Sequence, residues 1–600
     1  MENNKIPQRA EIPAEYKWAV EDLYATDDAW EQELSTLHAD SELLSTYAGR
    51  LAESPETLYE YLEHMERIYA KADMLGNYCN RRADEDTRNP VYQAMRGRFK
   101  TIAVALNASC SFEMSEVMAI SDEMLGDFYR GCPKLERYRR YLTNLRRRKA
   151  HVLSAPEEKL LAAAGDMAGS PSTIYRTFVD ADIKFPDAVD ANGVKHPLTQ
   201  ESFVPLETSS DRVLRKSAYE NLYHGYDKYK NTAAAILDAQ GKQLKFFADA
   251  RHYPSAFEAA LDRTNVPTSV YLNLIDTVHK HLDKMHRYVR LRKKVLGVDE
   301  LHFYDVYAPL LSKLDKRIPF EQAKQTVYEA LYPMGEDYRS ILKKGFESRW
   351  IDVYENEGKR SGAYSAGGAV HPFVLLNYSG TLKSQFTLAH EMGHAIHSYL
   401  SEKHQNPIDS DYVIFVAEVA STCNEALLME HLLSKTTDRQ ERAYLINHFL
   451  EQFKGTLYRQ TMFAEFELFI GRMIAEGKSV TAQDLCAEYR RLNELYFGDA
   501  MVVDDEIAME WARIPHFYYN YYVFQYATGY SAAIALSRRI LSEGEPAVKD
   551  YLEFLSGGCT KSPIDLLKGA GVDMTTPAPV DKALELFGSL VEELEQLLEE

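Results

Sequence analysis

The sequence lacks the features that place a protein in a membrane or in an oxidising compartment. Its six cysteines are scattered over 600 residues without a CxxC pair, so we expect no disulfide framework and a reducing environment. No run of about 18 or more apolar residues occurs, and the polar N-terminus, MENNKIPQRAEIPAEYKW, has no apolar stretch of signal-peptide length. We therefore expect a soluble protein of the cytoplasm with no membrane span.

Basic residues are also fewer than acidic residues. The chain carries 69 Lys and Arg against 90 Asp and Glu, a formal net charge of −21, which disfavours nucleic acids and anionic membranes as partners. The hydrophobic fraction of 45% and the charged fraction of 26% are ordinary for a globular protein. Internal repeats and low-complexity linkers are absent too. The composition leaves the oligomeric state open.

Most of the chain is predicted to be helical. Ser54, Pro55 and Glu56 fit the start of a helix, with proline in the first turn. Apolar residues recur there at spacings of three and four, which most simply reflects core packing. The same pattern runs through residues 54–72, 89–118, 156–168, 211–247, 269–295 and 581–600. We expect a mainly α fold, with a helical N-terminal region over 1–205 and a second domain over 206–600.

Residues 361–380, SGAYSAGGAVHPFVLLNYSG, break the helical pattern. Glycines and serines flank the short apolar run 372–376, and this composition is typical of strands and turns. We predict a small β-hairpin or sheet there, directly before a histidine-rich helix. Its edge could take up an extended peptide by strand addition. The alternative is a structural hairpin that contacts no ligand.

Two histidines four residues apart indicate a metal site in TLKSQFTLAHEMGHAIHSYL. On a helix, His390 and His394 lie one turn apart on one face, where two imidazoles can bind one zinc ion. Glu391 lies beside the first histidine, so its carboxylate can act on a water at the metal. His397 is better explained as a packing residue, because one helix face cannot supply three ligands and leave a position open.

Glu418 is the candidate for the third ligand. It stands in FVAEVASTCNEALL, within an apolar helix predicted over about 412–433. A carboxylate in such surroundings is costly to bury unless it is paired or bound to a metal. Glu425 follows seven residues later on the same face, where it can fix the tautomer and orientation of a histidine. The alternative for both glutamates is a place on a solvent-exposed face.

These residue types predict hydrolysis by a metal-activated water. Zinc lowers the pKa of water bound to it, and Glu391 would accept the proton and deliver it to the leaving amine. The oxyanion that forms needs hydrogen-bond donors. Residues 513–533, RIPHFYYNYYVFQYATGYSAA, offer His516, Tyr519 and Tyr522 at intervals of three, with Tyr518 and Tyr526 as close competitors. An aromatic core helix is the alternative.

Together these segments resemble the thimet oligopeptidase family of zinc peptidases, and within it the oligoendopeptidase F branch. The glutamate 24 residues after the second histidine carries the resemblance, and so does the order of the separate segments. The matching segments are RVLRKSAYENLYHGY, LHFYDVYAPL, AYSAGGAVHPFVLLNYSGT, LAHEMGHAIHS, FVAEVASTCNEALL and IPHFYYNYYVFQYATGYSAA. The spacing between the late histidine and the tyrosines matches the thimet branch only with a gap.

The resemblance implies a large helical body of two lobes that enclose a deep channel, with zinc at its floor. It implies an oligoendopeptidase that cleaves internal bonds of short peptides. One zinc ion per chain would be held by His390, His394 and Glu418, and Glu391 would be the catalytic base. A late histidine and tyrosines would bind the oxyanion and substrate. The N-terminal region would include an oligopeptidase F-type domain around residues 110–185.

Two other functions remain open from the sequence. A zinc carboxypeptidase of related helical fold would need a cation near the metal to hold the C-terminal carboxylate of its substrate, and the sequence marks none for that role. A protein that only binds peptides would not need the catalytic base, and the presence of Glu391 argues against that function. Position 422 is Thr, whereas the thermolysin pattern has an acidic residue four positions after its third ligand.

Overall fold

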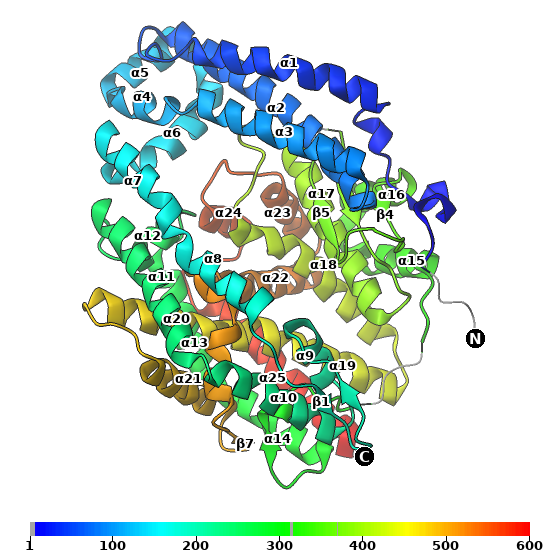
Figure 1. The fold of residues 1–600 in the computed structure, drawn as a ribbon. Coiled ribbons are helices and arrows are strands. Elements are labelled where there is room, and N and C mark those ends of the chain that lie inside the picture. The colour runs from blue at the N-terminus through cyan, green and yellow to red at the C-terminus, as the bar shows by residue number, and fades with distance from the viewer. Residues whose placement is uncertain (1–5, 312–315, 369, 600) are drawn as a thin grey trace. The chain divides into compact units, whose positions relative to one another are not determined.

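The computed structural model describes residues 6–311, 316–368 and 370–599, and most of them are helical, as the sequence predicts (Figure 1). Contacts divide the chain into two compact units. Unit 1 comprises Met1–Val152, Lys316–His431 and Leu536–Gly571, and unit 2 comprises Leu153–Asp315, Leu432–Ala535 and Val572–Glu600. The expected boundary between residues 205 and 206 falls within a helix of unit 2. The division into 1–205 and 206–600 and the channel between lobes stay predictions.

Unit 1 is built mainly of helices and contains one small sheet. Its elements are α1 (Asp27–Ser45), α2 (Pro55–Glu85), α3 (Pro90–Ser109), α4 (Glu113–Ala119), α5 (Asp122–Gly131), α6 (Arg139–Arg147), α15 (Phe320–Ala330), α16 (Gly335–Glu347), β4 (Ile351–Asp352), β5 (Tyr364–Ala366), β6 (Phe373–Leu375), α17 (Leu382–His404), most of α18 (Ile414–Lys435), the end of α22 (Phe524–Glu543), α23 (Glu545–Leu555) and α24 (Pro563–Gly569).

Unit 2 is also mainly helical and contains two pairs of short strands. Its elements are α7 (Ala155–Ala168), α8 (Ser170–Thr177), β1 (Ala188–Val189), β2 (Lys195–His196), α9 (Gln200–Glu207), α10 (Arg212–Asp227), α11 (Lys230–Ala250), α12 (Ala256–Asp262), α13 (Thr268–Lys280), α14 (Leu282–Leu296), β3 (Leu301–His302), α19 (Arg439–Phe453), α20 (Arg459–Ala475), α21 (Ala482–Phe497), β7 (Met501–Val502), the start of α22 and α25 (Ala578–Glu599).

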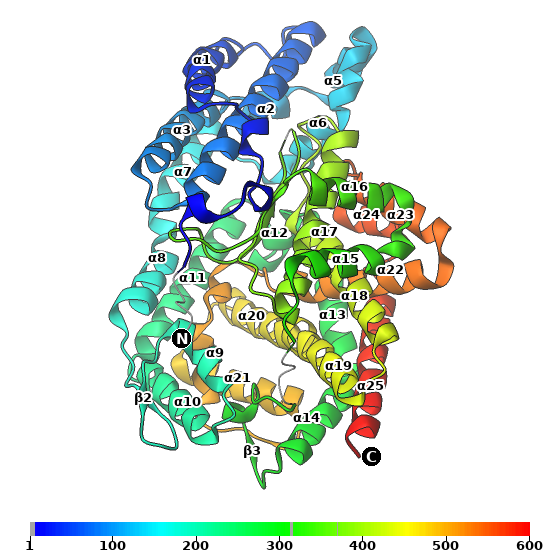
Figure 2. The same ribbon diagram turned by 90° about the vertical axis from the view of Figure 1, so that its right-hand side faces the viewer.

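The first three long helices of unit 1 lie side by side in both views (Figures 1 and 2). Helix α2 begins where the sequence predicts, since the Ser54 hydroxyl accepts the N–H of Thr57 at 3.1 Å and Pro55 occupies the first turn. The apolar core of these helices extends to Phe373 and Leu375 of β6, both fully buried. The N-terminal helices and the sheet therefore share one core.

The predicted β structure in residues 361–380 is confirmed. Strand β6 lies in the centre of a three-stranded sheet, with β5 antiparallel to it on one side and β4 parallel on the other. Helix α17 packs against both β5 and β6, so the sheet lies beside the histidine-rich helix. Strand β4 was not predicted, because two residues are too few to show an alternating pattern.

Several predicted helical stretches contain a break. The pattern over 211–247 covers α10 and α11, which meet around Tyr229, and the pattern over 269–295 covers α13 and α14, which meet at His281. No glycine or proline marks either break, so composition gives no signal for it.

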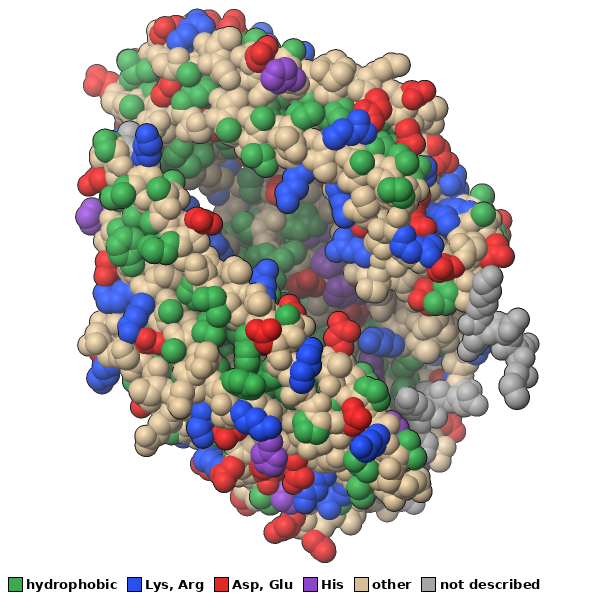
Figure 3. Space-filling model, viewed as in Figure 1, with side chains coloured by type: hydrophobic (Ala, Val, Ile, Leu, Met, Phe, Trp, Pro, Cys, Tyr) green, Lys and Arg blue, Asp and Glu red, His purple; other side chains and the backbone are tan. Residues whose placement is uncertain are grey.

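Charged side chains of both signs lie among hydrophobic and uncharged groups on the face that Figure 3 shows. Among the described residues, every helix is too short or too polar to cross a bilayer.

Candidate active site

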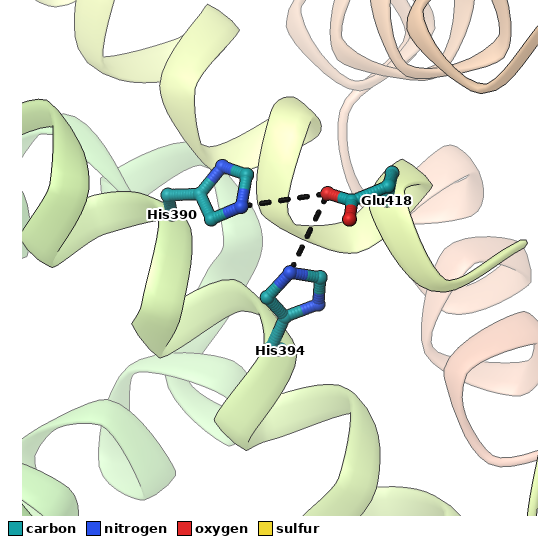
Figure 4. Close-up of side chains that lie close together, drawn as sticks. All are labelled: His390, His394 and Glu418. Atoms are coloured by element: carbon teal, nitrogen blue, oxygen red, sulfur yellow. Dashed lines mark ion pairs between the residues drawn. The ribbon is translucent and has the colours of Figure 1, made fainter. Parts of the chain in front are cut away.

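The two histidines and the candidate third ligand lie together in unit 1 (Figure 4). His390 and His394 project from α17, and Glu418 projects from α18. Oε2 of Glu418 is 3.4 Å from Nε2 of His390 and 3.5 Å from Nε2 of His394. One donor atom from each residue lies within 4.8 Å of the others, and all three side chains remain partly exposed. This arrangement leaves room for an ion between the three atoms.

A glycine allows α17 and α18 to come close enough for this geometry. A Cβ atom on Gly393 would lie 2.6 Å from Cα of Ser421 and 2.7 Å from the carbonyl oxygen of Ala420, both on the backbone of α18. Only glycine fits this contact without a shift of one helix. Because Gly393 stands between the two histidines and Ser421 is three residues after Glu418, the contact sets the distance between the ligands.

Asn424 fixes the register of the same two helices. Its side-chain Nδ2 donates to the carbonyl oxygen of Ala389 on α17 at 3.1 Å, and its Oδ1 accepts from the hydroxyl of Tyr338 on α16 at 2.7 Å. Asn424, Ala389 and Tyr338 are all fully buried. Asn424 and Gly393 were not predicted as site residues, although an amide in an apolar helix and a glycine inside a helix are visible in the sequence.

Glu425 contacts the first histidine from the side away from Glu418. Its Oε1 lies 2.6 Å from Nδ1 of His390. Because a carboxylate only accepts, Nδ1 carries the proton, which leaves Nε2 facing Glu418. The Ser421 hydroxyl donates to Oε2 of Glu418 at 3.1 Å, so the third carboxylate is also oriented by its own helix.

Glu391 is the most buried acid of the cluster. Its side chain is 6% exposed, and its Oε2 has no hydrogen-bond partner within the part of the chain that the structure describes. Burial raises the pKa of Glu391, while the charges of His390 and His394 oppose the rise. An unsatisfied buried carboxylate oxygen indicates a missing donor, such as a water, beside the two histidines.

The ionisable groups of the cluster shift each other's pKa strongly. Burial alone would raise the pKa of Glu418, but the hydrogen bond and charge of His394, with the charge of His390, bring it to about 2. Burial alone would lower the pKa of His390, but the Glu425 carboxylate raises it to about 9. Charge on the imidazoles and charge on the carboxylates therefore stabilise one another.

His397 lies outside the cluster of three. Its ring stacks on Tyr412 at a centroid distance of 3.7 Å and an angle of 8°, and it is 1% exposed. Burial, with a smaller contribution from the charge of His394, lowers the pKa of His397 to about 3. A buried, stacked and neutral imidazole acts in packing.

The donor set fits a divalent cation. Two imidazole nitrogens and one carboxylate oxygen leave a further coordination position open, as in catalytic zinc sites. The orphaned Oε2 of Glu391 lies in the same cluster without a partner among the described residues. A bound ion that carries a water would use the open coordination position and would give Oε2 of Glu391 a hydrogen-bond donor. An ion pair between histidine and glutamate would explain neither feature.

The aromatic segment, residues 513–533, belongs to unit 2 and is not one continuous helix. A short helix, η11 (Pro515–Tyr518), is followed by Asn520 and Tyr521, whose φ angles are 59° and 55°, before α22 begins. His516, Tyr519 and Tyr522 therefore do not lie on one helix face. Their rings still meet edge to face, with centroid distances of 5.4 Å for His516–Tyr519 and 6.3 Å for Tyr519–Tyr522.

The structure separates the two competitors, Tyr518 and Tyr526. Tyr526 joins the partly exposed group, since its ring is 5.3 Å from Tyr522 and 6.0 Å from His516. Tyr518 is 8% exposed and stacks on Tyr175 at 4.2 Å. Burial lowers the pKa of His516, so its ring is neutral near pH 7. The roles assigned to these residues, and to those of the metal cluster, stay predictions.

Comparisons with known proteins agree with the resemblance found in the sequence. Residues 206–586 match Peptidase family M3, and residues 116–185 match Oligopeptidase F. Oligopeptidase PepF of Bacillus subtilis is 44% identical over 596 residues, which cover 99% of this chain and 89% of that protein.

Solved structures show the same relationship. A crystal structure of a Chlamydophila abortus protein has a TM-score of 0.93 at 35% identity and covers 99% of this chain and 100% of its own. The crystal structure of oligoendopeptidase-F from Enterococcus faecium has a TM-score of 0.75 at 37% identity and covers 95% and 99%. The resemblance to oligoendopeptidase F is thereby confirmed, and the chain belongs to peptidase family M3, a family of metallopeptidases, and is a peptide hydrolase.

Proposed function

We propose that this protein is a zinc-dependent oligoendopeptidase of the cytoplasm that hydrolyses internal bonds of short peptides. The observation that carries the proposal is the meeting of His390, His394 and Glu418 across two helices. The names of the relatives support it, because the proteins from B. subtilis and E. faecium are called an oligopeptidase and an oligoendopeptidase.

His390, His394 and Glu418 would hold the ion, and Glu425 would keep Nδ1 of His390 protonated so that Nε2 faces it. Zinc bound there would supply Lewis-acid activation of the attacking water and of the peptide carbonyl. Glu391 would accept the proton of that water and deliver it to the leaving nitrogen. Its raised pKa makes it a stronger base than an exposed glutamate.

The remaining parts of the reaction are substrate binding and stabilisation of the oxyanion. Strand β5 is an edge strand with partly exposed residues, and it can take up an extended peptide by strand addition. His516, Tyr519 and Tyr522, joined by Tyr526, present N–H and O–H donors from one partly exposed group, as stabilisation of an oxyanion requires.

The test uses an internally quenched oligopeptide with the purified protein. We expect cleavage at an internal bond that a chelator abolishes and zinc restores. Glu391→Gln should lower kcat by about 10²–10⁴ while the variant keeps its zinc, measured by elemental analysis. Glu402→Gln is a matched control, because Glu402 lies on the same helix outside the metal cluster and should leave kcat unchanged.

Product masses separate this function from a carboxypeptidase. An oligoendopeptidase releases two internal fragments and cleaves a C-terminally amidated peptide as fast as the free acid. Release of single C-terminal residues, or full activity of Glu391→Gln, would refute the proposal.

A further inference from the structure

Two arginines of unit 2 share a single buried carboxylate. Arg459 is the first residue of α20, Arg513 lies between α21 and α22, and both donate to Oε1 of Glu510, at 2.6 Å and 3.0 Å. Because both bonds end on one oxygen, the two guanidinium groups lie next to each other. Each packs over a phenylalanine ring, Arg459 over Phe463 at 4.8 Å and Arg513 over Phe203 at 5.0 Å. We call Arg459, Arg513 and Glu510 the arginine cluster.

The arginine cluster carries an excess of positive charge. Burial alone would raise the pKa of Glu510, but the charges of Arg459 and Arg513 bring it to about 2, so this carboxylate is ionised near pH 7. Burial raises the pKa of the nearby Glu207 to about 8 against the charge of Arg513, so this side chain is mainly protonated near pH 7. Guanidinium groups stay charged at that pH. Two positive charges therefore meet one negative charge.

The hydrogen-bonding capacity of the two guanidinium groups is only partly used. Within the described part of the chain, Arg459 donates to Glu510 alone, and Arg513 donates to Glu510 and, through Nε, to the hydroxyl of Tyr223. A guanidinium has five N–H donors, so Nε and Nη1 of Arg459 and Nη1 of Arg513 bond to no described residue. None of these three nitrogens is fully enclosed, and the two side chains are 16% and 12% exposed. These donors are therefore open to a ligand.

A second cluster of unit 2 shows how the fold itself can supply acceptors. Arg292 and Lys454 both bond to Glu451, which again gives two cations and one carboxylate. There, Nη2 of Arg292 also donates to the carbonyl oxygen of Ala308 at 2.8 Å, and Nζ of Lys454 donates to that of Val306 at 2.8 Å. Among the described residues, no main-chain oxygen does this for the arginine cluster, so solvent or a ligand supplies its acceptors.

Tyr307 adds a hydroxyl donor to the arginine cluster. It is partly exposed, and its hydroxyl bonds to no residue that the structure describes. Burial raises the pKa of Tyr307, and the charge of Arg459 opposes the rise, so the hydroxyl lies within electrostatic reach of that guanidinium. We propose that Arg459 and Arg513 form a binding site for a carboxylate, which accepts hydrogen bonds from the open edges of both guanidinium groups and from Tyr307.

Shape and charge select a carboxylate for this site. The planar fork of a guanidinium matches the two oxygens of a carboxylate, and such charge-assisted bonds are the strong ones in proteins. The single positive charge in excess equals the charge of one carboxylate, whereas a phosphate group carries about −1.5 to −2 at pH 7. The same chemistry is offered by the acidic side chain of a peptide and by a free small carboxylate.

The probe is the α-amide of N-acetylglutamate, whose only charge is the side-chain carboxylate, with the α-amide of N-acetylglutamine as its uncharged counterpart. Both are titrated into the zinc-loaded protein by calorimetry. We expect saturable binding of the glutamate probe and binding of the glutamine probe that is about tenfold or more weaker. Arg459→Gln should weaken the glutamate probe by about tenfold or more and leave the glutamine probe unchanged. Tyr307→Phe should weaken the glutamate probe by about threefold or more.

Arg212→Gln is the matched control. Arg212 is also one of two arginines in unit 2 that share a carboxylate, here that of Asp305, but it lies outside the arginine cluster. This variant should keep the affinity of wild type. The proposal is overturned if wild type does not bind the glutamate probe, or if Arg459→Gln and Tyr307→Phe both bind it as tightly as wild type, as a carboxylate bound at the metal would. Tyr307→Phe breaks no bond between described residues, so it decides the matter if Arg459→Gln does not fold.

Quenched peptides identify the source of the carboxylate, and this arm alone rests on the proposed function. Peptides with an amidated C-terminus are compared in pairs that differ only in Glu against Gln, at each position in turn. If the ligand is a peptide side chain, the Glu peptide of one pair has the lower KM, and Arg459→Gln removes the difference. If the ligand is a free carboxylate, the KM values of every pair are equal. A protein that binds the glutamate probe but cleaves no peptide would refute the proposed function and leave the carboxylate site intact.

Discussion

Replacing Gly393 by alanine should weaken zinc binding as well as the fold. The new Cβ would lie 2.6 Å from Cα of Ser421, and ordinary contact begins at 3.4 Å, so α17 and α18 must separate by roughly 0.8 Å. Metal–ligand distances tolerate only about 0.2 Å. Because His390 and His394 are on one helix and Glu418 is on the other, the separation pulls the carboxylate away from the imidazoles.

The effects of Gly393→Ala on stability and on zinc binding can be estimated separately. Overpacking costs about 1–3 kcal/mol, and removal of a helical glycine returns up to about 1 kcal/mol, so the free energy of unfolding should fall by only about 0–2 kcal/mol. The zinc Kd should rise about 10–100-fold, as for loss of a group that orients a ligand.

Competition with a chromophoric chelator measures the zinc Kd, and urea unfolding measures stability. Gly97→Ala is the control, because a Cβ on Gly97 of α3 meets nothing within 4 Å and should leave zinc binding unchanged. A zinc Kd equal to wild type in Gly393→Ala would refute the reasoning.

Three further changes test neighbouring parts of the structure. Glu425→Gln removes the charge that orients His390, so zinc affinity should fall about 10–100-fold in the same titration; an unchanged Kd would contradict this role. Asn424→Ala leaves the Tyr338 hydroxyl and the Ala389 carbonyl without their shared partner. The free energy of unfolding in urea should fall by about 1–3 kcal/mol, and a fall below about 0.5 kcal/mol would contradict this role. Native Glu467, whose pKa burial raises to about 8, keeps a proton that the unfolded chain releases above about pH 4.5. The free energy of unfolding should therefore fall as pH rises from about 4.5 to about 8, and it should fall less steeply in Glu467→Gln. Equal dependence on pH in both proteins would count against the raised pKa.

The metal cluster could be predicted because its geometry is local. His390 and His394 share a face by helix periodicity alone, and Glu418 stands out as a charge among apolar neighbours. The hairpin of β5 and β6 was visible for a similar reason, since its glycines and short apolar run contrast with the helices on either side. Each of these signals lies within about 30 residues of sequence.

Other features depend on contacts between distant residues and leave no local signal. The break between α10 and α11 lacks glycine or proline, so periodicity runs across it. The left-handed turn at Asn520 and Tyr521 is held by Glu467, more than 50 residues earlier, and it removes the helix face that the spacing of His516 and Tyr519 suggested.

The charges of the metal cluster favour a divalent cation over a simple ion pair between a histidine and a glutamate. Glu391, Glu418 and Glu425 bring three carboxylates to a partly exposed site, and a proton on His390, whose pKa is about 9, offsets part of this charge. His390 donates its Nδ1 proton to Glu425, and the hydrogen bond that lowers the pKa of Glu418 comes from His394. His394 lies as close to the same carboxylate oxygen, at 3.5 Å against 3.4 Å. An ion pair would need one of the two histidines, whereas a divalent cation between the three atoms uses both and neutralises more of the negative charge.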